Sequence, residues 1–456
     1  MSEALWTAAD IAAATGGTAY GDFTADGVAF DSREVGPGDL FVALTGETTD
    51  GHRFLDQAFA QGAAGAIVSE DAARPRIRVG DTFAALRDLA RAARARTAAT
   101  IVGVTGSVGK TSAKEALFAA LDRSMPGAVH RSVKSYNNHT GVPLSLARMP
   151  VPTRVGVFEM GMNHAGELAD LTRLVRPHVA LVTAIAPAHT AFFAGEEAIA
   201  DAKGEIFQGL QPGGTAIVPF DSPHRDRLIA AAQPYAARIV TFGMKEGADV
   251  RSLEAMRLPT GTFVTARIGE RELSFTMAQP GMHWVSNALA VLAAVDAVGA
   301  DLGLAGLALA EMGGLAGRGA RMPVSLAEGE ALLIDESYNA NPASMRATLA
   351  VLGHEPGRHV AVLGEMRELG DDSATYHASL AEPIAAARVE AVVLVGEAMA
   401  PLAAALEGHT ELVHVMAAAD ALAALRSMLA PGDAVLIKGS NGVGLSRVVA
   451  GLADGA

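Results

Sequence analysis

The clearest chemical signal in this chain is the segment GSVGKTS at residues 106–112. An apolar run at 100–104 precedes it and a helical pattern at 113–121 follows it. A glycine-rich turn between a strand and a helix N-terminus directs several backbone N–H groups at a phosphate. Lys110 would add a cation for the outer phosphates, and Thr111 a hydroxyl ligand for Mg²⁺. The segment therefore predicts a site that binds ATP or GTP and uses its terminal phosphate.

The match to the usual phosphate-binding loop is incomplete. That pattern has its first glycine where this chain has Val104, and the glycines here are Gly103 and Gly106. A glycine turn with a solvated lysine is the alternative, but the strand before and the helix after favour phosphate binding. The candidate segment comprises Thr105, Gly106, Ser107, Val108, Gly109, Lys110, Thr111 and Ser112.

Composition limits the class of partner. The chain has 456 residues, half of them hydrophobic, and a formal net charge of −14. That charge argues against a nucleic-acid or anionic-membrane surface, which needs a basic footprint. The absence of cysteine excludes disulfides, thiolate zinc sites and a cysteine nucleophile, and it suits a reducing cytoplasm. The uncharged stretches at 177–195 and 273–295 contain proline, glycine and histidine, so we expect no membrane-spanning helix. The N-terminal residues MSEALWTAADIAA lack a basic region and a long apolar core, so we expect no signal peptide.

Strand-like and helix-like segments alternate along the chain, which predicts an α/β fold of about three domains. Residues 1–82 form a small α/β unit. Residues 83–317 repeat strand, turn and helix, as expected of a largely parallel sheet covered on both faces. The glycine cluster at 313–319 is a candidate hinge. In residues 318–456, strand-like runs again alternate with helices, which predicts a second, doubly wound sheet.

Polar residues fall at the ends of several predicted strands. Glu159 ends VGVF, His189 follows VALVTAIA, Asp335 ends ALLI and Lys438 ends AVLI. Ligands of open α/β sheets collect at this edge. Glu159 is an ordinary ligand for Mg²⁺, whereas His189 is a less usual one and indicates a second metal position. A helix-capping or core role is the alternative for His189.

Lys203 stands in line with apolar residues on a helix predicted over 196–210. An inward lysine can extend to solvent, pair with a carboxylate such as Glu159 or Asp201, or lose its proton on burial. A neutral amine can react with CO₂ to give a carbamate, an anionic ligand for Mg²⁺. Spacing alone favours the salt bridge over the carbamate.

These motifs together resemble the Mur ligases, ATP-dependent amide ligases of peptidoglycan precursor synthesis, along essentially the whole chain. The order of EMGMNHAGEL and DESYNANPASM is typical of the branch that adds D-alanyl-D-alanine. The resemblance rests on DSREVGPGDLFVAL (31–44), DGHRF (50–54), TGSVGKTS (105–112), SYNNHTGVP (135–143), EMGMNHAGEL (159–168), APAHTAFF (186–193), AKGEIF (202–207), GMHWVSNALA (281–290), GR (317–318), DESYNANPASM (335–345), GEMRELG (364–370) and LIKGSNGVGLS (436–446).

The resemblance implies roles for individual residues. It implies ATP and two Mg²⁺ ions as cofactors, with a carbamylated Lys203 instead of the salt bridge. The implied catalytic residues are Lys110, Lys203, His189 and Glu159, and the implied metal ligands are Thr111, Glu159, His189 and Lys203. Further ATP contacts are Asn137, Asn138, Asn287, Arg318, Asp335, Tyr338, Asn339 and Asn341, and the UDP-substrate contacts are Ser32, Arg33, Asp50, Gly51 and His52.

The resemblance also implies the reaction and its partners. A UDP-N-acetylmuramoyl-tripeptide would bind at 1–82, ATP at 83–317, and D-alanyl-D-alanine at 318–456, in a cytoplasmic monomer. The tripeptide carboxylate would become an acyl phosphate before the amine attacks. Two positions depart from the family pattern, since Glu365 stands where aspartate is common and Asn441 where arginine often follows KGS.

Two alternatives remain at this stage. A ligase similar to folylpolyglutamate synthase shares the central and C-terminal pattern but not the DSR and DGHRF segments of this chain. A P-loop switch ATPase would need an aspartate at a strand end and a nucleotide-specificity motif, and the sequence has Glu159 instead.

Overall fold

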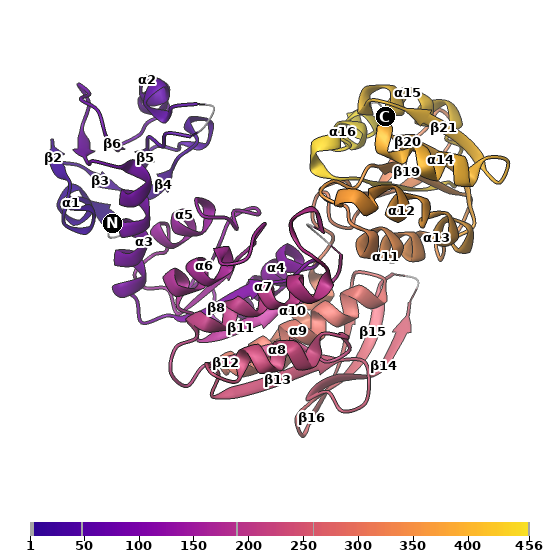
Figure 1. Cartoon of the computed structure of the whole chain (residues 1–456), viewed down its shortest axis with the longest axis horizontal. Helices are drawn as coiled ribbons and strands as arrows, with labels where there is room; N and C mark the ends of the chain where they lie inside the picture. Colours follow the sequence, from indigo (N-terminus) through magenta and orange to yellow (C-terminus); the bar gives the residue numbers. More distant parts are fainter. Residues whose placement is uncertain (1–3, 47–48, 188–189, 259, 455–456) are drawn as a thin grey trace.

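The computed structural model describes residues 4–46, 49–187, 190–258 and 260–454. Three lobes follow one another along the chain, and the central lobe lies between the other two (Figure 1). Each lobe is built on its own largely parallel sheet with helices packed against it. The predicted α/β class with three domains is confirmed.

The N-terminal lobe has a sheet of order β2-β7-β6-β5-β4, parallel except between β2 and β7. Its last helix, α3 (Thr82–Ala95), packs Leu86 and Leu89 into this lobe and Ala90 into the next. The predicted boundary at 82/83 therefore falls at the start of a helix that both lobes share. The other elements are β1 (Trp6–Thr7), α1 (Ala8–Thr15), β2 (Thr18–Tyr20), β3 (Thr24–Ala25), β4 (Gly27–Ala29), β5 (Asp39–Val42), α2 (Leu55–Ala60), β6 (Gly65–Val68) and β7 (Arg76–Arg78).

The central lobe has a sheet of order β16-β15-β14-β13-β12-β11-β8-β10-β9. Strands β8 to β14 pair in parallel, and β14, β15 and β16 form an antiparallel edge. The apolar strands bury both faces, one under α4, α9 and α10 and the other under α5 to α8. The strands are β8 (Thr100–Thr105), β9 (Val129–Arg131), β10 (Val155–Glu159), β11 (Val179–Val182), β12 (Thr215–Pro219), β13 (Arg238–Gly243), β14 (Val250–Arg257), β15 (Thr262–Ile268) and β16 (Arg271–Met277), and the helices are α4 (Lys110–Ser124), α5 (Gly141–Ala147), α6 (Glu167–Val175), α7 (Glu196–Gly204), α8 (Arg225–Ala232), α9 (Met282–Val298) and α10 (Leu302–Glu311).

The C-terminal lobe has a sheet of order β17-β18-β22-β19-β20-β21, in which only β17 is antiparallel to its neighbour. Helices α11 to α14 pack on one face, and α15 and α16 on the other. This is the doubly wound arrangement that the sequence predicted. The elements are β17 (Ala320–Ser325), β18 (Glu330–Glu336), α11 (Pro342–Leu352), β19 (His359–Gly364), α12 (Ser373–Ala378), α13 (Ala381–Ala386), β20 (Val389–Val395), α14 (Ala400–Leu406), β21 (Glu411–Val415), α15 (Ala418–Met428), β22 (Ala434–Lys438) and α16 (Ser446–Asp454).

The helix predicted over 196–210 is wrong at its C-terminal end. The α-helix α7 stops at Gly204, and a 3₁₀ helix continues over Glu205–Gly209. Thr172 of α6 donates its hydroxyl hydrogen bond to the Ile206 carbonyl at 2.6 Å, while Gly204 weakens the helix locally.

In the described ranges, no helix combines the length and apolar character that crossing a membrane requires.

One buried carboxylate joins the central and C-terminal lobes. The Glu355 side chain, just after α11, is only 4% exposed. Its Oε1 lies 2.8 Å from Nη2 of Arg257 in β14, and its Oε2 pairs with Arg321 of β17. A buried charge is stable only while its partners remain in place. Glu355 therefore holds the antiparallel edge of the central sheet against the C-terminal lobe.

We expect Glu355→Gln to lower the free energy of unfolding by about 2 kcal/mol, because it leaves two guanidinium groups without their counter-charge. Urea unfolding followed by circular dichroism measures the change. Glu382→Gln is the matched control, since Glu382 is 88% exposed and lies 3.9 Å from Arg346. Equal unfolding midpoints for the two variants would contradict this role for Glu355.

Candidate functional site

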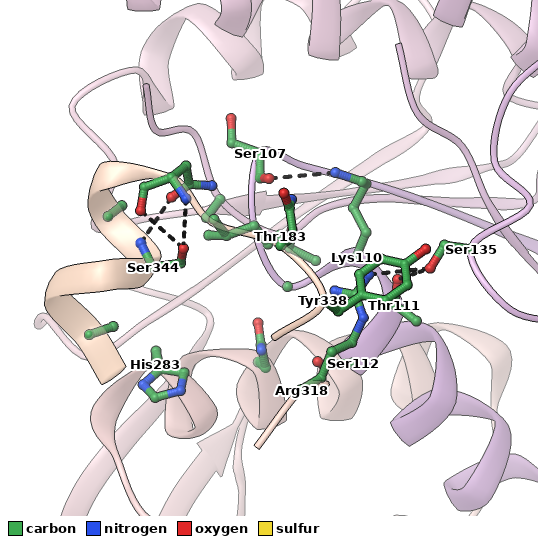
Figure 2. A pocket seen from close by; sticks show the side chains of 18 of the residues that line it. Ser107, Lys110, Thr111, Ser112, Ser135, Thr183, His283, Arg318, Tyr338 and Ser344 are labelled. Carbon is green, nitrogen blue, oxygen red and sulfur yellow. Dashed lines mark hydrogen bonds between the residues drawn. The ribbon is translucent and has the colours of Figure 1, made fainter. Parts of the chain in front are cut away.

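A cavity of about 460 Å³ lies where the central and C-terminal lobes meet (Figure 2). Its walls come from the loops after β8, β9 and β10, the N-terminal part of α9, the turn before β17 and the segment that runs from the end of β18 into α11. The lining therefore unites segments far apart in the sequence. The predicted site residues that line it are Ser107, Val108, Gly109, Lys110, Thr111, Ser112, Asn137, Glu159, Asn287, Arg318, Tyr338, Asn339 and Asn341.

The glycine-rich loop has the strand–turn–helix form that phosphate binding requires. It follows β8, and Gly109, with φ of 82°, caps α4. A Cβ at Gly109 would lie 2.6 Å from Oδ1 of Asn287, and one at Gly106, with φ of 151°, would lie 1.9 Å from Oγ1 of Thr183. Both positions therefore require glycine. Lys110 donates through Nζ to the Gly106 carbonyl at 2.6 Å, so its cation lies over the loop.

The candidate metal ligands lie beside this loop. Glu159 ends β10 and is 1% exposed. Its Oε1 accepts a hydrogen bond from Nδ2 of Asn137 at 2.7 Å. Within the described residues its Oε2 has no hydrogen-bond partner, and it lies 3.7 Å from Nζ of Lys114. The Thr111 hydroxyl is 3.2 Å from the hydroxyl of Ser135. The Glu159 carboxylate and the Thr111 hydroxyl line the same cavity, and oxygen ligands of this kind fit a hard cation such as Mg²⁺.

The other two predicted metal ligands are His189 and Lys203. His189 lies outside the described residues. Among the residues that the structure does describe, no group of three or more histidine, aspartate, glutamate or cysteine side chains gathers as a metal site. The predicted second metal position therefore stays a prediction.

Lys203 is 1% exposed, and its Nζ has no hydrogen-bond partner among the described residues. The salt bridge that spacing favoured is absent, because Asp201 pairs with Arg227 at 2.9 Å and the near cation of Glu159 is Lys114. Burial lowers the pKa of Lys203 well below its usual value, and the Lys110 charge lowers it further. Burial thus shifts this side chain towards its neutral form.

Arg318 ties the C-terminal lobe to the phosphate loop. Its guanidinium lies 4.2 Å from the ring centroid of Tyr338, and its Nη2 donates to Oγ of Ser135 at 3.2 Å. Ser135 also contacts Thr111, so one hydroxyl joins the loop to the other lobe. In Figure 2, Arg318 and Tyr338 lie beside Thr111, while His283 is at the opposite end of the cavity.

Asp335 does not line the cavity. Its buried Oδ2 accepts a hydrogen bond from the Gly317 N–H at 2.7 Å, and its Oδ1 accepts from the N–H and hydroxyl of Ser337. These bonds shape the turn that carries Arg318. Three other predicted ATP contacts are also absent from the lining, namely Thr105, Gly106 and Asn138. A direct contact from any of the four to ATP stays a prediction.

Two residues that line the cavity, Glu336 and His283, were not predicted as site residues from the sequence. Glu336 and His283 line it with Lys438, whose Nζ lies 3.5 Å from Oε2 of Glu336 and donates to the Asn339 carbonyl at 2.9 Å. Burial raises the pKa of Glu336 and lowers that of Lys438. The end of ALLIDE was a usable signal for Glu336, because it follows Asp335 at the same strand end. For His283 the signal was the motif at 281–290, from which only Asn287 was taken as a site residue.

The predicted UDP-substrate residues lie in the N-terminal lobe. Ser32 donates through Oγ to Oε1 of Gln57 at 3.0 Å. Arg33 pairs with Asp31 at 2.6 Å and is 79% exposed. The remaining three residues form one turn, in which Asp50 precedes Gly51 and His52. The His52 ring lies 2.7 Å from Oδ1 of Asp50 through Nδ1 and accepts from the Ser69 N–H at 3.0 Å through Nε2.

Three family models match the chain. The Mur ligase family catalytic domain matches residues 24–97, the Mur ligase middle domain residues 104–295, and the Mur ligase glutamate ligase domain residues 320–441. The UDP-N-acetylmuramoyl-tripeptide–D-alanyl-D-alanine ligase of Escherichia coli is 36% identical over 95% of this chain and 95% of its own length. The ligase of that name from Bacillus subtilis is 34% identical over 94% of this chain and 93% of its own.

Several solved structures have the same fold as this chain. A MurF structure from Acinetobacter baumannii has a TM-score of 0.86 and 33% identity, and covers 98% of this chain and 99% of its own. MurF from Thermotoga maritima in complex with ADP has a TM-score of 0.77 and 26% identity, with 94% and 97% covered. Escherichia coli FolC has a TM-score of 0.59 at 20% identity, with 80% and 92% covered, which shows a common fold alone.

We expect the His283 imidazole to stay neutral at pH 7 and to titrate only near pH 4, because burial, together with the nearby Lys438 charge, lowers its pKa to about 4. The unfolded chain binds that proton at about pH 6.5, so folding stability declines as pH falls from about 6.5 towards 4. Histidine NMR titration of the nucleotide-free protein measures the pKa, and His283→Gln assigns the resonance. A midpoint above pH 6 would contradict burial of this ring.

Proposed function

Because the chain belongs to the Mur ligase family, we propose that it joins D-alanyl-D-alanine to a UDP-N-acetylmuramoyl-tripeptide at the cost of one ATP, in the synthesis of peptidoglycan precursors. The observation that carries this proposal is the cavity in which the phosphate loop meets Arg318 and Tyr338 of the C-terminal side. Relatives named for this activity match the chain over nearly its full length.

The reaction needs an activated acid, because a free carboxylate has no good leaving group. The carboxylate oxygen attacks the γ-phosphorus, ADP leaves, and an acyl phosphate results. The amine then attacks the acyl carbon, the tetrahedral intermediate releases phosphate, and the amine gives up a proton as the amide forms. The charge that develops on the phosphoryl group is stabilised by the cations of Lys110 and Arg318.

Thr111 and Glu159 are the residues that would hold Mg²⁺. The metal ion, when bound, supplies further neutralisation of the phosphate charges. The chain's own contribution is to fix these ligands beside the loop: Asn137 holds one oxygen of the Glu159 carboxylate, and Ser135 holds the Thr111 hydroxyl.

An acyl phosphate is hydrolysed if water reaches it, so the two lobes must enclose it. Two glycines with left-handed backbone, Gly317 with φ of 71° and Gly319 with φ of 85°, flank Arg318. We propose that residues 318–456 carry in the acceptor and close on the ATP-binding region 83–317 at this turn. Asp335 would keep the turn in shape through its bond to Gly317.

The uridine end of the substrate is proposed to bind residues 1–82. Ser32 and Arg33 follow β4, while Asp50, Gly51 and His52 follow β5, at the carboxyl edge of parallel strands. One chain contributes every part of the proposed machinery, so we propose that it acts as a monomer. We place the reaction in the cytoplasm, since it consumes ATP and the chain has no cysteine.

The direct test follows phosphate release with ATP, Mg²⁺, UDP-N-acetylmuramoyl-tripeptide and D-alanyl-D-alanine, each omitted in turn. We expect rapid release only with all four, because the amine is needed to discharge the acyl phosphate. Replacing D-alanyl-D-alanine by L-glutamate is the control for a ligase of the folylpolyglutamate type. Release without any acceptor would instead support a switch ATPase and overturn the proposal.

We further propose that Lys203 carries a carbamate that completes a metal site. Its neutral amine would attack CO₂, form a C–N bond and lose one proton, leaving an anionic carboxylate on Nζ. Support comes from this buried nitrogen, which has no hydrogen-bond partner in the part of the chain that the structure describes, and from the nearby Lys110, whose charge a carbamate would balance. With Mg²⁺ bound, the carbamate would act as a second carboxylate beside Glu159.

Lys203→Ala should lower turnover by about a hundredfold, because it removes charge at the phosphoryl site, while ATP binding is retained. Carbon-13 NMR of protein equilibrated with labelled bicarbonate should show a carbamate signal that this variant lacks. The exposed Lys245 is the matched control, and Lys245→Ala should keep both signal and turnover. The carbamate hypothesis is excluded by a signal that persists in Lys203→Ala.

A further inference from the structure

The segment 134–137 forms part of the wall of the nucleotide cavity and contacts the proposed metal ligands. Ser135 and Asn137 line the cavity. The hydroxyl of Ser135 is 3.2 Å from that of Thr111, and the two residues lie side by side in Figure 2. Nδ2 of Asn137 donates to the Glu159 carboxylate at 2.7 Å. The position of this segment therefore influences where the oxygen ligands for Mg²⁺ stand.

The backbone of this segment needs support from its surroundings. It lies between β9 and α5, outside any helix or strand. Lys134 has a φ of 51°, in the left-handed region that a lysine rarely adopts. Such a conformation persists only where neighbouring groups impose it. One of these groups belongs to the central lobe, since the fully buried Lys114 donates through Nζ to the Lys134 carbonyl.

Further support comes from the N-terminal lobe. Glu34 is the last residue of a single-turn 3₁₀ helix over Ser32–Glu34. Its Oε1 pairs with Nζ of Lys134, and the Tyr136 hydroxyl lies 2.8 Å from each of its carboxylate oxygens. The Phe30 ring packs on that of Tyr136, with centroids 5.7 Å apart. One carboxylate of the first lobe thus holds two side chains of the cavity wall.

The protonation states at this contact suit its geometry. Burial by itself would raise the pKa of the Glu34 carboxyl, but the hydrogen bonds from Lys134 and Tyr136 outweigh it and lower the pKa below its usual value. Burial and the bond to Glu34 raise the pKa of Tyr136 to about 12. At neutral pH the carboxylate is therefore ionised, and the phenol keeps the proton that it donates. Hydrogen bonds to an ionised acceptor are stronger than those between neutral groups.

Glu34 also adjoins the proposed site for the uridine end of the substrate. It follows Ser32 and Arg33 in the same helical turn, and the Arg33 side chain is 79% exposed. A ligand that binds these two residues orders the turn and, with it, the Glu34 carboxylate. The nucleotide then meets a segment 134–137 that is already held, so its binding costs less conformational entropy.

We propose that Glu34 is a positioning residue through which the UDP-substrate, bound to the N-terminal lobe, strengthens ATP binding in the central lobe. The inference rests on the proposed ligase function and extends it to the communication between two of its substrates. Glu34 does not line the nucleotide cavity, so it acts through the segment 134–137 rather than by contact with ATP. Coupling between two binding sites is reciprocal, and ATP therefore strengthens binding of the UDP-substrate by the same factor.

Isothermal titration calorimetry tests this coupling with Mg²⁺ and the non-hydrolysable analogue β,γ-imido-ATP. The titration is made with and without saturating UDP-N-acetylmuramoyl-tripeptide, and no acceptor is present. In the unmodified enzyme, the UDP-substrate should lower the Kd of the analogue about fivefold or more. Glu34→Gln should bring this factor close to one, because it removes the charge that holds Lys134 and Tyr136.

A second variant and a control complete the comparison. Tyr136→Phe removes only a hydroxyl group and should also reduce the factor. Asp22→Asn is the matched control, because Asp22 is an exposed carboxylate of the same lobe, and it should keep the full factor. Thermal unfolding of each variant is measured alongside, since a merely structural contact would lower the unfolding midpoint without changing the factor.

Two results overturn the inference. One is a full factor in either Glu34→Gln or Tyr136→Phe, whatever the unfolding midpoint. The other is an unmodified enzyme that binds the UDP-tripeptide but then binds the ATP analogue no more tightly. Failure of the unmodified enzyme to bind the UDP-tripeptide at all overturns the proposed function instead.

Discussion

Buried charge at the carboxyl edge of the central sheet is the constraint on which the rest of the structure depends. Lys114 is fully buried 3.7 Å from Glu159, and Lys110 lies over the phosphate loop, where its charge also lowers the pKa of the buried Lys203. Cations withdrawn from water are costly unless anions approach them. In a chain of net charge −14, this local excess of positive charge indicates where phosphate groups are to be held.

The connection between lobes follows from the same site. Arg318 could not contact Ser135 unless the turn before β17 were fixed, and Asp335 fixes it from inside the sheet through the Gly317 N–H. A carboxylate that the sequence placed at a strand end thus acts on the cavity through backbone geometry. The Glu355 pairs with Arg257 and Arg321 hold the lobes together on another side, so the cavity is bounded by fixed contacts.

The predictions made from the sequence were confirmed where a structural feature depends on residues close together in the chain. The glycine-rich loop depends on the backbone freedom of Gly106 and Gly109 and on the helix that follows, all within a few residues. They failed for the partner of Lys203, because its helical spacing shows that it points inward but not what it meets there. The predicted C-terminal end of helix α7 was wrong for a similar reason. The structure ends the helix at Gly204, and the hydroxyl of Thr172, on another helix, donates a hydrogen bond to the Ile206 carbonyl.

The sequence alone determined the fold class, the phosphate loop and the family resemblance, because alternating apolar runs and short motifs express local backbone preferences. Only the tertiary structure decided which side chains share a cavity, since lining residues such as His283 and Glu336 come from elements with no fixed sequence distance to the loop. It also decided that Glu34 meets Lys134 and Tyr136, because the N-terminal and central lobes come into contact only when the chain is folded. Burial, which shifts the pKa values of Lys203 and His283, likewise exists only after packing.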